Sequence, residues 1–165
     1  MRIAGKSVLA WVCMAGAALA GCPQGATTVL GCTLGGGAKT LSLCIDGDTV
    51  RYDFGKTGKP PELSLSEPVA TVAHQPWPGV GRAIWEATTL TNAGYAYEVW
   101  MSVDRLSENA LPEGGVNVMQ GEKTVAELRC DPGTASVSLW AVDDAKQALG
   151  ICWNFETFSW GGCSG

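Results

Sequence analysis

The segment 40–54, TLSLCIDGDTVRYDF, decides the fold class because it has the pattern of a complete β-hairpin. Apolar and polar residues alternate on both sides of Asp46-Gly47, a dipeptide favoured in two-residue hairpin turns. A turn at these residues pairs Leu43 with Val50 and places the apolar side chains of both strands on one face. The segment therefore predicts an antiparallel sheet with one face turned towards a core.

A second hairpin is expected around Asn92-Ala93-Gly94, and the length of its loop decides which side chains face the core. A three-residue loop places Trp85 opposite Met101 on the inner face and Glu86 opposite Trp100 on the outer face. A two-residue turn would instead place Glu86 against Met101, where desolvation of the carboxylate costs free energy. We therefore expect the longer loop and an outward-facing Glu86.

Further turn signals divide the rest of the chain into short elements. We expect a third hairpin from Gly115 to Cys130 that turns at Gly121-Glu122-Lys123 and places Val116 opposite Leu128. We also expect short strands from Glu62 to Ser66 and from Val69 to Ala73. The one good helix candidate is Leu139–Leu149, which Gly150 ends. Many short strands followed by one short C-terminal helix predict a mainly β protein, an antiparallel sandwich or small barrel built from hairpins.

The N-terminus has the pattern of an export signal. Two basic residues, Arg2 and Lys6, precede the apolar run Val8–Ala20, which is short for a membrane span and ends in small residues. We expect residues 1–21 to be a signal peptide and residues 22–165 to form a single disulfide-containing β domain. The formal net charge of −5 argues against nucleic acid as a partner and permits a basic protein partner.

Two cleavage sites one residue apart decide the chemistry of Cys22. Ala18-Leu19-Ala20 fits ordinary signal cleavage and would release a soluble periplasmic protein. Leu19-Ala20-Gly21-Cys22 is similar to the lipobox that precedes the lipid-modified cysteine of bacterial lipoproteins. The match at all four positions favours lipidation of Cys22 and a membrane anchor. Both cuts predict a protein of the periplasm or cell envelope.

The number of cysteines favours the ordinary cut. Six follow Cys13, and an even count in an exported chain predicts a disulfide framework. Lipidation of Cys22 would leave one thiol unpaired. A bond between Cys44 and nearby Cys32 would explain why Cys44 lies on the outer face of its hairpin, although the connectivity stays open. The disulfide candidates are Cys32, Cys44, Cys130, Cys152 and Cys163.

Patterns typical of catalysis are missing from the sequence. His74 is the only histidine, so a metal site built on several imidazoles is impossible. No GxSxG motif supplies a serine nucleophile. We therefore expect no catalytic residue, no metal site and no cofactor.

The segment 74–86, HQPWPGVGRAIWE, is the strongest candidate for recognition. Prolines stiffen the chain around Trp77 and glycines permit a sharp return, so the loop is suited to present Trp77 and Arg82 to a partner. An outward-facing Trp100 beside Glu86 could contact a sugar or a protein. Two alternatives stay open, in which Trp77 caps the core or the helix covers Trp100. The predicted binding residues are His74, Trp77, Arg82, Glu86 and Trp100.

Four stretches of the chain carry a family resemblance: TLSLCIDGDTVRYDFGKTGKPPELSLS, PWPGVGRAIWE, GYAYEVW and GGVNV. They resemble a family of uncharacterised exported bacterial β proteins with a lipoprotein-type signal peptide. A weaker resemblance is to the periplasmic and lipoprotein lysozyme inhibitors, whose Ser-Gly-x-x-Tyr pattern this chain lacks.

The predicted architecture, acidity and compartment favour a non-enzymatic cell-envelope binding module. One form of such a module is an inhibitor of a basic wall-degrading enzyme. The expected partner of the module is a basic protein or a cell-wall component. One alternative is a structural envelope lipoprotein without a small ligand. The other is an unrecognised periplasmic hydrolase, which would need His74 or a close pair of carboxylates in a cleft.

Overall fold

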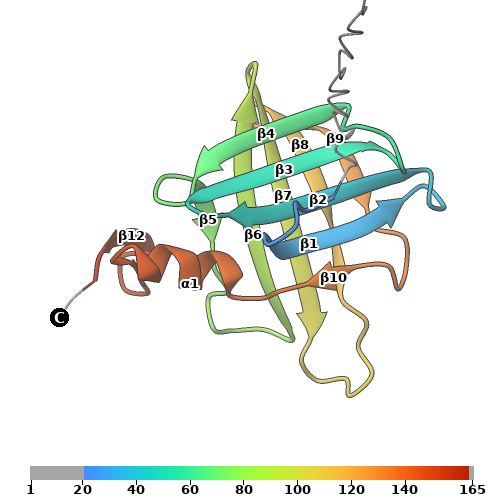
Figure 1. The fold of residues 1–165 in the computed structure, drawn as a ribbon. Helices are drawn as coiled ribbons and strands as arrows, with labels where there is room; N and C mark the ends of the chain where they lie inside the picture. The colour runs from blue at the N-terminus through green and yellow to red at the C-terminus, as the bar shows by residue number, and fades with distance from the viewer. Residues whose placement is uncertain (1–20, 164–165) are drawn as a thin grey trace, which may run out of the picture.

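The computed structural model describes residues 21–163, so residues 1–20 of the predicted signal peptide lie outside the described residues. Two antiparallel sheets face each other, and their strands cross rather than run alongside one another (Figure 1). The first sheet has the order β10 (Ser136–Val137), β1 (Thr27–Leu34), β2 (Lys39–Asp46), β3 (Thr49–Lys56) and β4 (Leu63–Pro68). The second has the order β5 (Ala73–Gln75), β6 (Ala83–Asn92), β7 (Tyr95–Asp104), β8 (Glu113–Gln120) and β9 (Lys123–Arg129).

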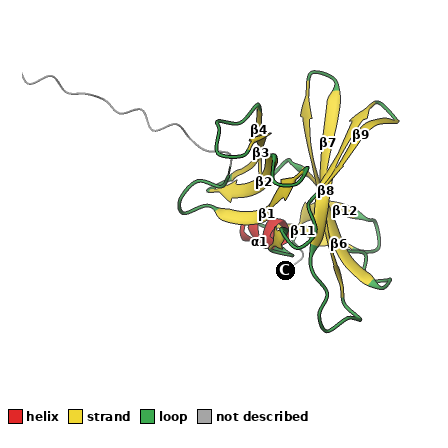
Figure 2. Cartoon of the chain, turned by 90° about the vertical axis from the view of Figure 1, so that its right-hand side faces the viewer, coloured by secondary structure: helices red, strands yellow, loops and turns green. Residues whose placement is uncertain are grey.

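The C-terminal part of the described chain adds one helix and one hairpin to this sandwich. Helix α1 (Ala141–Ala148) leads into the two-stranded hairpin of β11 (Ile151–Asn154) and β12 (Ser159–Gly162). Figure 2 shows the two sheets as separate layers, with α1 beside β1. No helix in residues 21–163 is long and apolar enough to cross a membrane.

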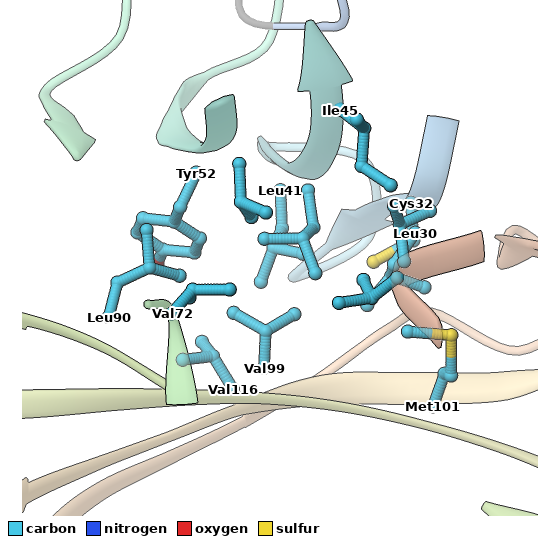
Figure 3. Packing of buried hydrophobic residues seen from close by; sticks show 14 of the residues in the cluster. Leu30, Cys32, Leu41, Ile45, Tyr52, Val72, Leu90, Val99, Met101 and Val116 are labelled. Atoms are coloured by element: carbon cyan, nitrogen blue, oxygen red, sulfur yellow. The ribbon is translucent and has the colours of Figure 1, made fainter. Parts of the chain in front are cut away.

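The core lies between the inner faces of the two sheets. Leu41 and Tyr52 of the first sheet point towards Val99 and Val116 of the second (Figure 3), and all four side chains are almost completely buried. Burial of apolar area at this scale is the main favourable term in folding. The prediction of a mainly β, antiparallel, sandwich-like fold with one short C-terminal helix is confirmed.

The first hairpin forms as predicted, with a register that is shifted by two residues. Asp46 pairs with Thr49, so Gly47-Asp48 makes the turn, and Leu43 faces Tyr52 instead of Val50. Gly47 has φ 56°, the left-handed conformation that this first loop position requires and that glycine adopts without strain. A shift by two residues keeps every side chain on its predicted face.

The predicted register of the second hairpin is wrong. Asn92 pairs with Tyr95 across a two-residue turn in which Ala93 and Gly94 both have positive φ, 48° and 82°. The backbone twist of such a two-residue turn matches the right-handed twist of the two strands that it joins. The one-residue difference reverses the faces of β6, so Glu86 lies opposite Met101 in the interior.

The remaining elements follow the predictions with two differences. In the third hairpin Val116 faces Leu128 as predicted, but the turn is shortened to Gly121-Glu122 and a bulge follows it. Residues 69–72 form a turn rather than a strand, because the N–H groups of Thr71 and Val72 both donate to the Pro68 carbonyl. The helix ends before Gly150 as predicted.

Three disulfides pair all six cysteines of the described chain. They join Cys22 to Cys44, Cys32 to Cys130, and Cys152 to Cys163. The expected bond between Cys44 and Cys32 is therefore wrong. Cys32 is linked across 98 residues to the end of β9 instead, because the fold brings that end beside β1.

The Cys22–Cys44 bond also bears on the predicted lipid anchor. A lipoprotein carries its lipid on the sulfur of this cysteine, and in the structure that sulfur is bonded to Cys44. The two states exclude each other for one molecule. Three disulfides indicate an oxidising compartment, as the even number of cysteines predicts.

Candidate functional site

The structure does not bring the five predicted binding residues together. His74 and Glu86 are buried, with exposed fractions of 6% and 0%. Trp77 and Arg82 lie in the loop between β5 and β6 at one end of the sandwich. Trp100 alone lies on the outer face of the second sheet, the open surface opposite the core.

Three rows of side chains cross this outer face from strand to strand. Their members are neighbours on paired strands and point away from the core. The first row contains Trp85, Ser102 and Glu113. The second contains Ala87, Trp100, Gly115 and Arg129, and the third contains Thr89, Glu98, Asn117 and Glu127.

Trp100 occupies the middle row with the two smallest side chains beside it, Ala87 and Gly115. A Cβ atom at Gly115 would lie 2.2 Å from the carbonyl oxygen of Leu128, so the close approach of β9 requires glycine here. The Arg129 guanidinium lies 5.3 Å from the Trp100 ring centroid, a cation–π contact across the empty position. The indole thus lies in a row with no other large apolar side chain.

Two adjoining hollows form around this indole. Their volumes are about 290 and 410 Å³, and they share Trp100, Glu113 and Arg129. Volumes of this size lie near the lower end of those typical of small-molecule sites. We call the joined hollow the Trp100 groove; its lining includes Trp85, Trp100, Glu113, Asn117, Glu127 and Arg129.

Carboxylates dominate the charge around the Trp100 groove. Glu113 and Glu127 are exposed on its lining, and Arg129 is the single cation there. A third carboxylate on the lining is Asp131, and Glu98, beside the groove, accepts a hydrogen bond of 3.0 Å from Asn117 Nδ2. The groove therefore combines an aromatic surface with hydrogen-bond donors and acceptors and an excess of negative charge.

Sequence reasoning identified Trp100 but missed the rest of the groove. Trp85 was assigned to the core face because the longer turn was preferred. The residues Glu113, Asn117, Glu127 and Arg129 come from β8 and β9, and no local pattern marks them. The one available signal was Ala93-Gly94, which can make a two-residue turn and thereby places both tryptophans on one face.

A second polar cluster lies buried beneath α1. His74 Nδ1 is 2.8 Å from Thr88 Oγ1, and its Nε2 is 3.1 Å from Asp143 Oδ1, a contact without hydrogen-bond geometry. This order of acid, imidazole and hydroxyl is superficially that of a hydrolytic triad. Thr88 is completely buried, however, so its hydroxyl is closed to a substrate.

Lys146 attaches the helix to the same region. Its Nζ donates a 2.8 Å hydrogen bond to the Val69 carbonyl and lies 5.0 Å from the Trp160 ring centroid. The Trp160 indole N–H donates to the His74 carbonyl over 2.7 Å. Burial lowers the pKa of the Lys146 amine. These contacts tie α1 and the C-terminal hairpin to the sandwich.

Glu86 is a buried carboxylate with one hydrogen bond to the protein. Its Oε1 accepts the Trp140 N–H at 2.8 Å, and its Oε2 has no hydrogen-bond partner in residues 21–163. Burial, with the nearby charges of Asp143 and Asp144, raises the pKa of Glu86 to about 7. Trp140, whose N–H donates this hydrogen bond, has φ 70°, which is rare for a bulky residue.

The loop predicted for recognition is packed on its own neighbours. The Trp77 indole N–H donates to the Val80 carbonyl at 2.9 Å, and its ring contacts the Trp140 ring and the Arg105 guanidinium. Arg82 forms an ion pair of 2.7 Å with Asp104. These contacts correspond to the alternative in which Trp77 is a packing residue at the end of the sandwich.

The part of the chain that the structure describes contains no set of side chains that could bind a metal ion. No group of three or more His, Cys, Asp or Glu side chains within residues 21–163 is arranged to hold an ion.

The chain matches no protein-family model, no curated protein and no solved structure, so the resemblance noted in the sequence stays an expectation.

Proposed function

We propose that this protein is a non-enzymatic binding module of the cell envelope that holds its ligand in the Trp100 groove. The observation that carries the proposal is the position of the Trp100 indole between Ala87 and Gly115, with polar side chains in the rows on both sides. A concave surface with an aromatic wall and a few convergent polar groups is typical of binding sites. The rigid sheet beneath it holds these groups in place.

The proposal of a binding module rather than an enzyme is supported by the burial of the one histidine. His74 and its hydroxyl partner Thr88 are both closed to substrate. Along the groove, the row that contains the cationic Arg129 separates the carboxylates of Glu113 and Glu127. The groove is suited to hold a ligand rather than to transform it.

The compartment is part of the same proposal. We infer that the protein is exported, with Cys22 bonded to Cys44 rather than lipidated, because the disulfide uses the same sulfur. Intact mass of the mature protein tests this: we expect a mass without lipid that increases by two hydrogens per disulfide on reduction. An acylated Cys22 with a free Cys44 thiol would contradict it.

Binding to wall material tests the groove itself. The purified domain is mixed with insoluble cell-wall polymer and centrifuged, and the protein remaining in solution is measured. We expect the wild type to sediment and Trp100→Ala to stay in solution. Phe155→Ala is the matched control, because Phe155 is an exposed aromatic residue in the C-terminal hairpin, outside the groove. Equal sedimentation of all three proteins, or of none, would refute the proposal.

A second candidate is an inhibitor of a basic wall-degrading enzyme. The formal net charge of −5 and the carboxylates Glu98, Glu113 and Glu127 favour it, because opposite charges accelerate and orient association. The test is the activity of a basic lysozyme in the presence of the purified protein. We expect inhibition that weakens as salt rises. Full lysozyme activity at equimolar and excess protein would remove this candidate.

A further inference from the structure

We propose that the ligand of the Trp100 groove is an uncharged glycan chain. This inference rests on the proposed binding function and adds the chemical class of the ligand. It follows from the kind of surface on the groove, from its charge and from its open shape.

The aromatic part of the groove fits a sugar ring. One face of a pyranose exposes C–H groups, which pack on the flat surface of an indole. Trp100 has such a surface next to the small side chain of Ala87, while the Arg129 guanidinium lies over the ring from the Gly115 side. Trp85 lies on the adjacent strand in the next row, as a diagonal neighbour of Trp100. Two neighbouring indoles can therefore contact successive sugar rings.

The polar part of the groove fits sugar hydroxyls. Each hydroxyl both donates and accepts, so it pairs with either a carboxylate or a guanidinium. Carboxylates are present at Glu113 and Glu127, and donors are present at Asn117 and Arg129. These groups lie on both sides of the Trp100 indole. Arg129 is in the same row as Trp100, and the other three residues are in the two neighbouring rows. A ring stacked on Trp100 would have its edges within reach of them.

The charge of the groove selects against acidic polymers. Glu113, Glu127 and Glu98 bear negative charge, and Arg129 is the one positive group among them. This excess of negative charge would repel an anionic sugar and so disfavour its binding. A neutral sugar is not repelled.

The same composition argues against a protein as the occupant. Specific protein interfaces bury about 800 Å² on each partner, and their centres are depleted of charged residues. The three rows around Trp100 contain only two large apolar side chains, Trp85 and Trp100, among many polar ones, and the other apolar residues of the groove, Leu111, Pro112 and Pro132, lie at one end of it. Two adjoining hollows on an open face accommodate an extended chain better than a large apolar contact.

Calorimetry with defined oligosaccharides tests the inference. The uncharged probes are cellohexaose and hexa-N-acetylchitohexaose, and the anionic probe is hexagalacturonate. We expect at least one uncharged probe to bind the wild type. Hexagalacturonate should bind at least tenfold more weakly. Trp100→Ala should weaken binding of the uncharged probe at least tenfold, whereas Phe155→Ala should leave it unchanged.

Charge neutralisation gives a second readout that loss of folding would not produce. The double variant Glu113→Gln and Glu127→Gln should bind hexagalacturonate more tightly than the wild type does, because the repulsion is removed. No change in that affinity would overturn the charge argument. Calorimetric binding of the uncharged probe that is equally strong in Trp100→Ala would overturn the site.

The two proposals fail in different ways. If Trp100-dependent sedimentation with wall polymer occurs but neither uncharged probe binds, the glycan inference is overturned and the binding module stands. If neither sedimentation nor oligosaccharide binding occurs, both are overturned. Tighter binding of hexagalacturonate than of both uncharged probes would overturn the inference directly.

Discussion

Substitution of Glu86 by glutamine should remove a pH dependence of folding stability that the wild type shows. Glu86 is fully buried, and its pKa is raised from 4.5 to about 7, first by desolvation and then by the charges of Asp143 and Asp144. Below pH 4.5 the carboxyl is protonated in the folded and the unfolded chain. Between pH 4.5 and 7 the unfolded chain releases its proton while the folded protein retains it.

Stability therefore falls as pH rises through this window and is lowest above pH 7, where both states are ionised. A rise in pKa from 4.5 to about 7 corresponds to a loss of about 3 kcal/mol, because a tenfold change in a proton-binding constant is worth about 1.4 kcal/mol. Glutamine does not titrate, so Glu86→Gln should lack this loss. Its amide oxygen can still accept the Trp140 N–H, which donates to Oε1 in the wild type.

The assay is urea unfolding of the oxidised protein at pH 4.5, 6, 7 and 8, followed by far-ultraviolet circular dichroism. The quantity to compare is the difference in unfolding free energy between wild type and Glu86→Gln at each pH. It should change by about 3 kcal/mol from pH 4.5 to pH 8, in favour of glutamine at the higher pH. Burial of the amide is unfavourable and lowers the unfolding free energy of Glu86→Gln by about 1–3 kcal/mol at every pH. It does not alter how the difference from the wild type changes with pH.

Glu122→Gln, in the exposed turn between β8 and β9, controls for the change in net charge. It should give a difference that is flat over the same range. A flat difference for Glu86→Gln as well would refute the reasoning, since it would mean that the buried carboxyl titrates alike in the folded and unfolded states.

Two further predictions concern stability. Gly115→Ala should destabilise the protein by about 2 kcal/mol or more, because its Cβ would collide with the backbone of β9, whereas Gly161→Ala, with free space around it, should have little effect; thermal unfolding compares them. Equal midpoints would contradict the close approach of β8 and β9. Removing the Cys32–Cys130 disulfide should cost about 1–2 kcal/mol more than removing Cys152–Cys163 in urea unfolding, because the separations are 98 and 11 residues. An equal or smaller cost would show that loop length does not govern their effect.

Much of the fold could be predicted from local patterns. The alternation around Asp46 and the stop at Gly150 identify a hairpin and a helix without tertiary information, because each depends on the conformation of a few neighbouring residues. The faces of β6 could not be predicted in this way. They depend on one residue of loop length, and the desolvation of Glu86 argued for the longer loop.

That argument was wrong because it treated Glu86 as if it had no partner. In the folded protein the Trp140 N–H, 54 residues further along the chain, donates to its carboxylate. A raised pKa also allows the carboxyl to lose its charge at neutral pH and below. Neither circumstance has a signal in the sequence near Glu86.

The sequence by itself determined the class of the fold, the hairpins and the helix, because these depend on residue spacing and turn chemistry over short distances. It also implied an oxidising compartment through the even number of cysteines that follow Cys13. Only the tertiary structure decided which cysteines meet, which face Glu86 occupies, and that Trp85, Trp100 and Arg129 share one surface. The physical reason is that these relations depend on strand register and on contacts between distant segments, which exist only once the sheets have formed.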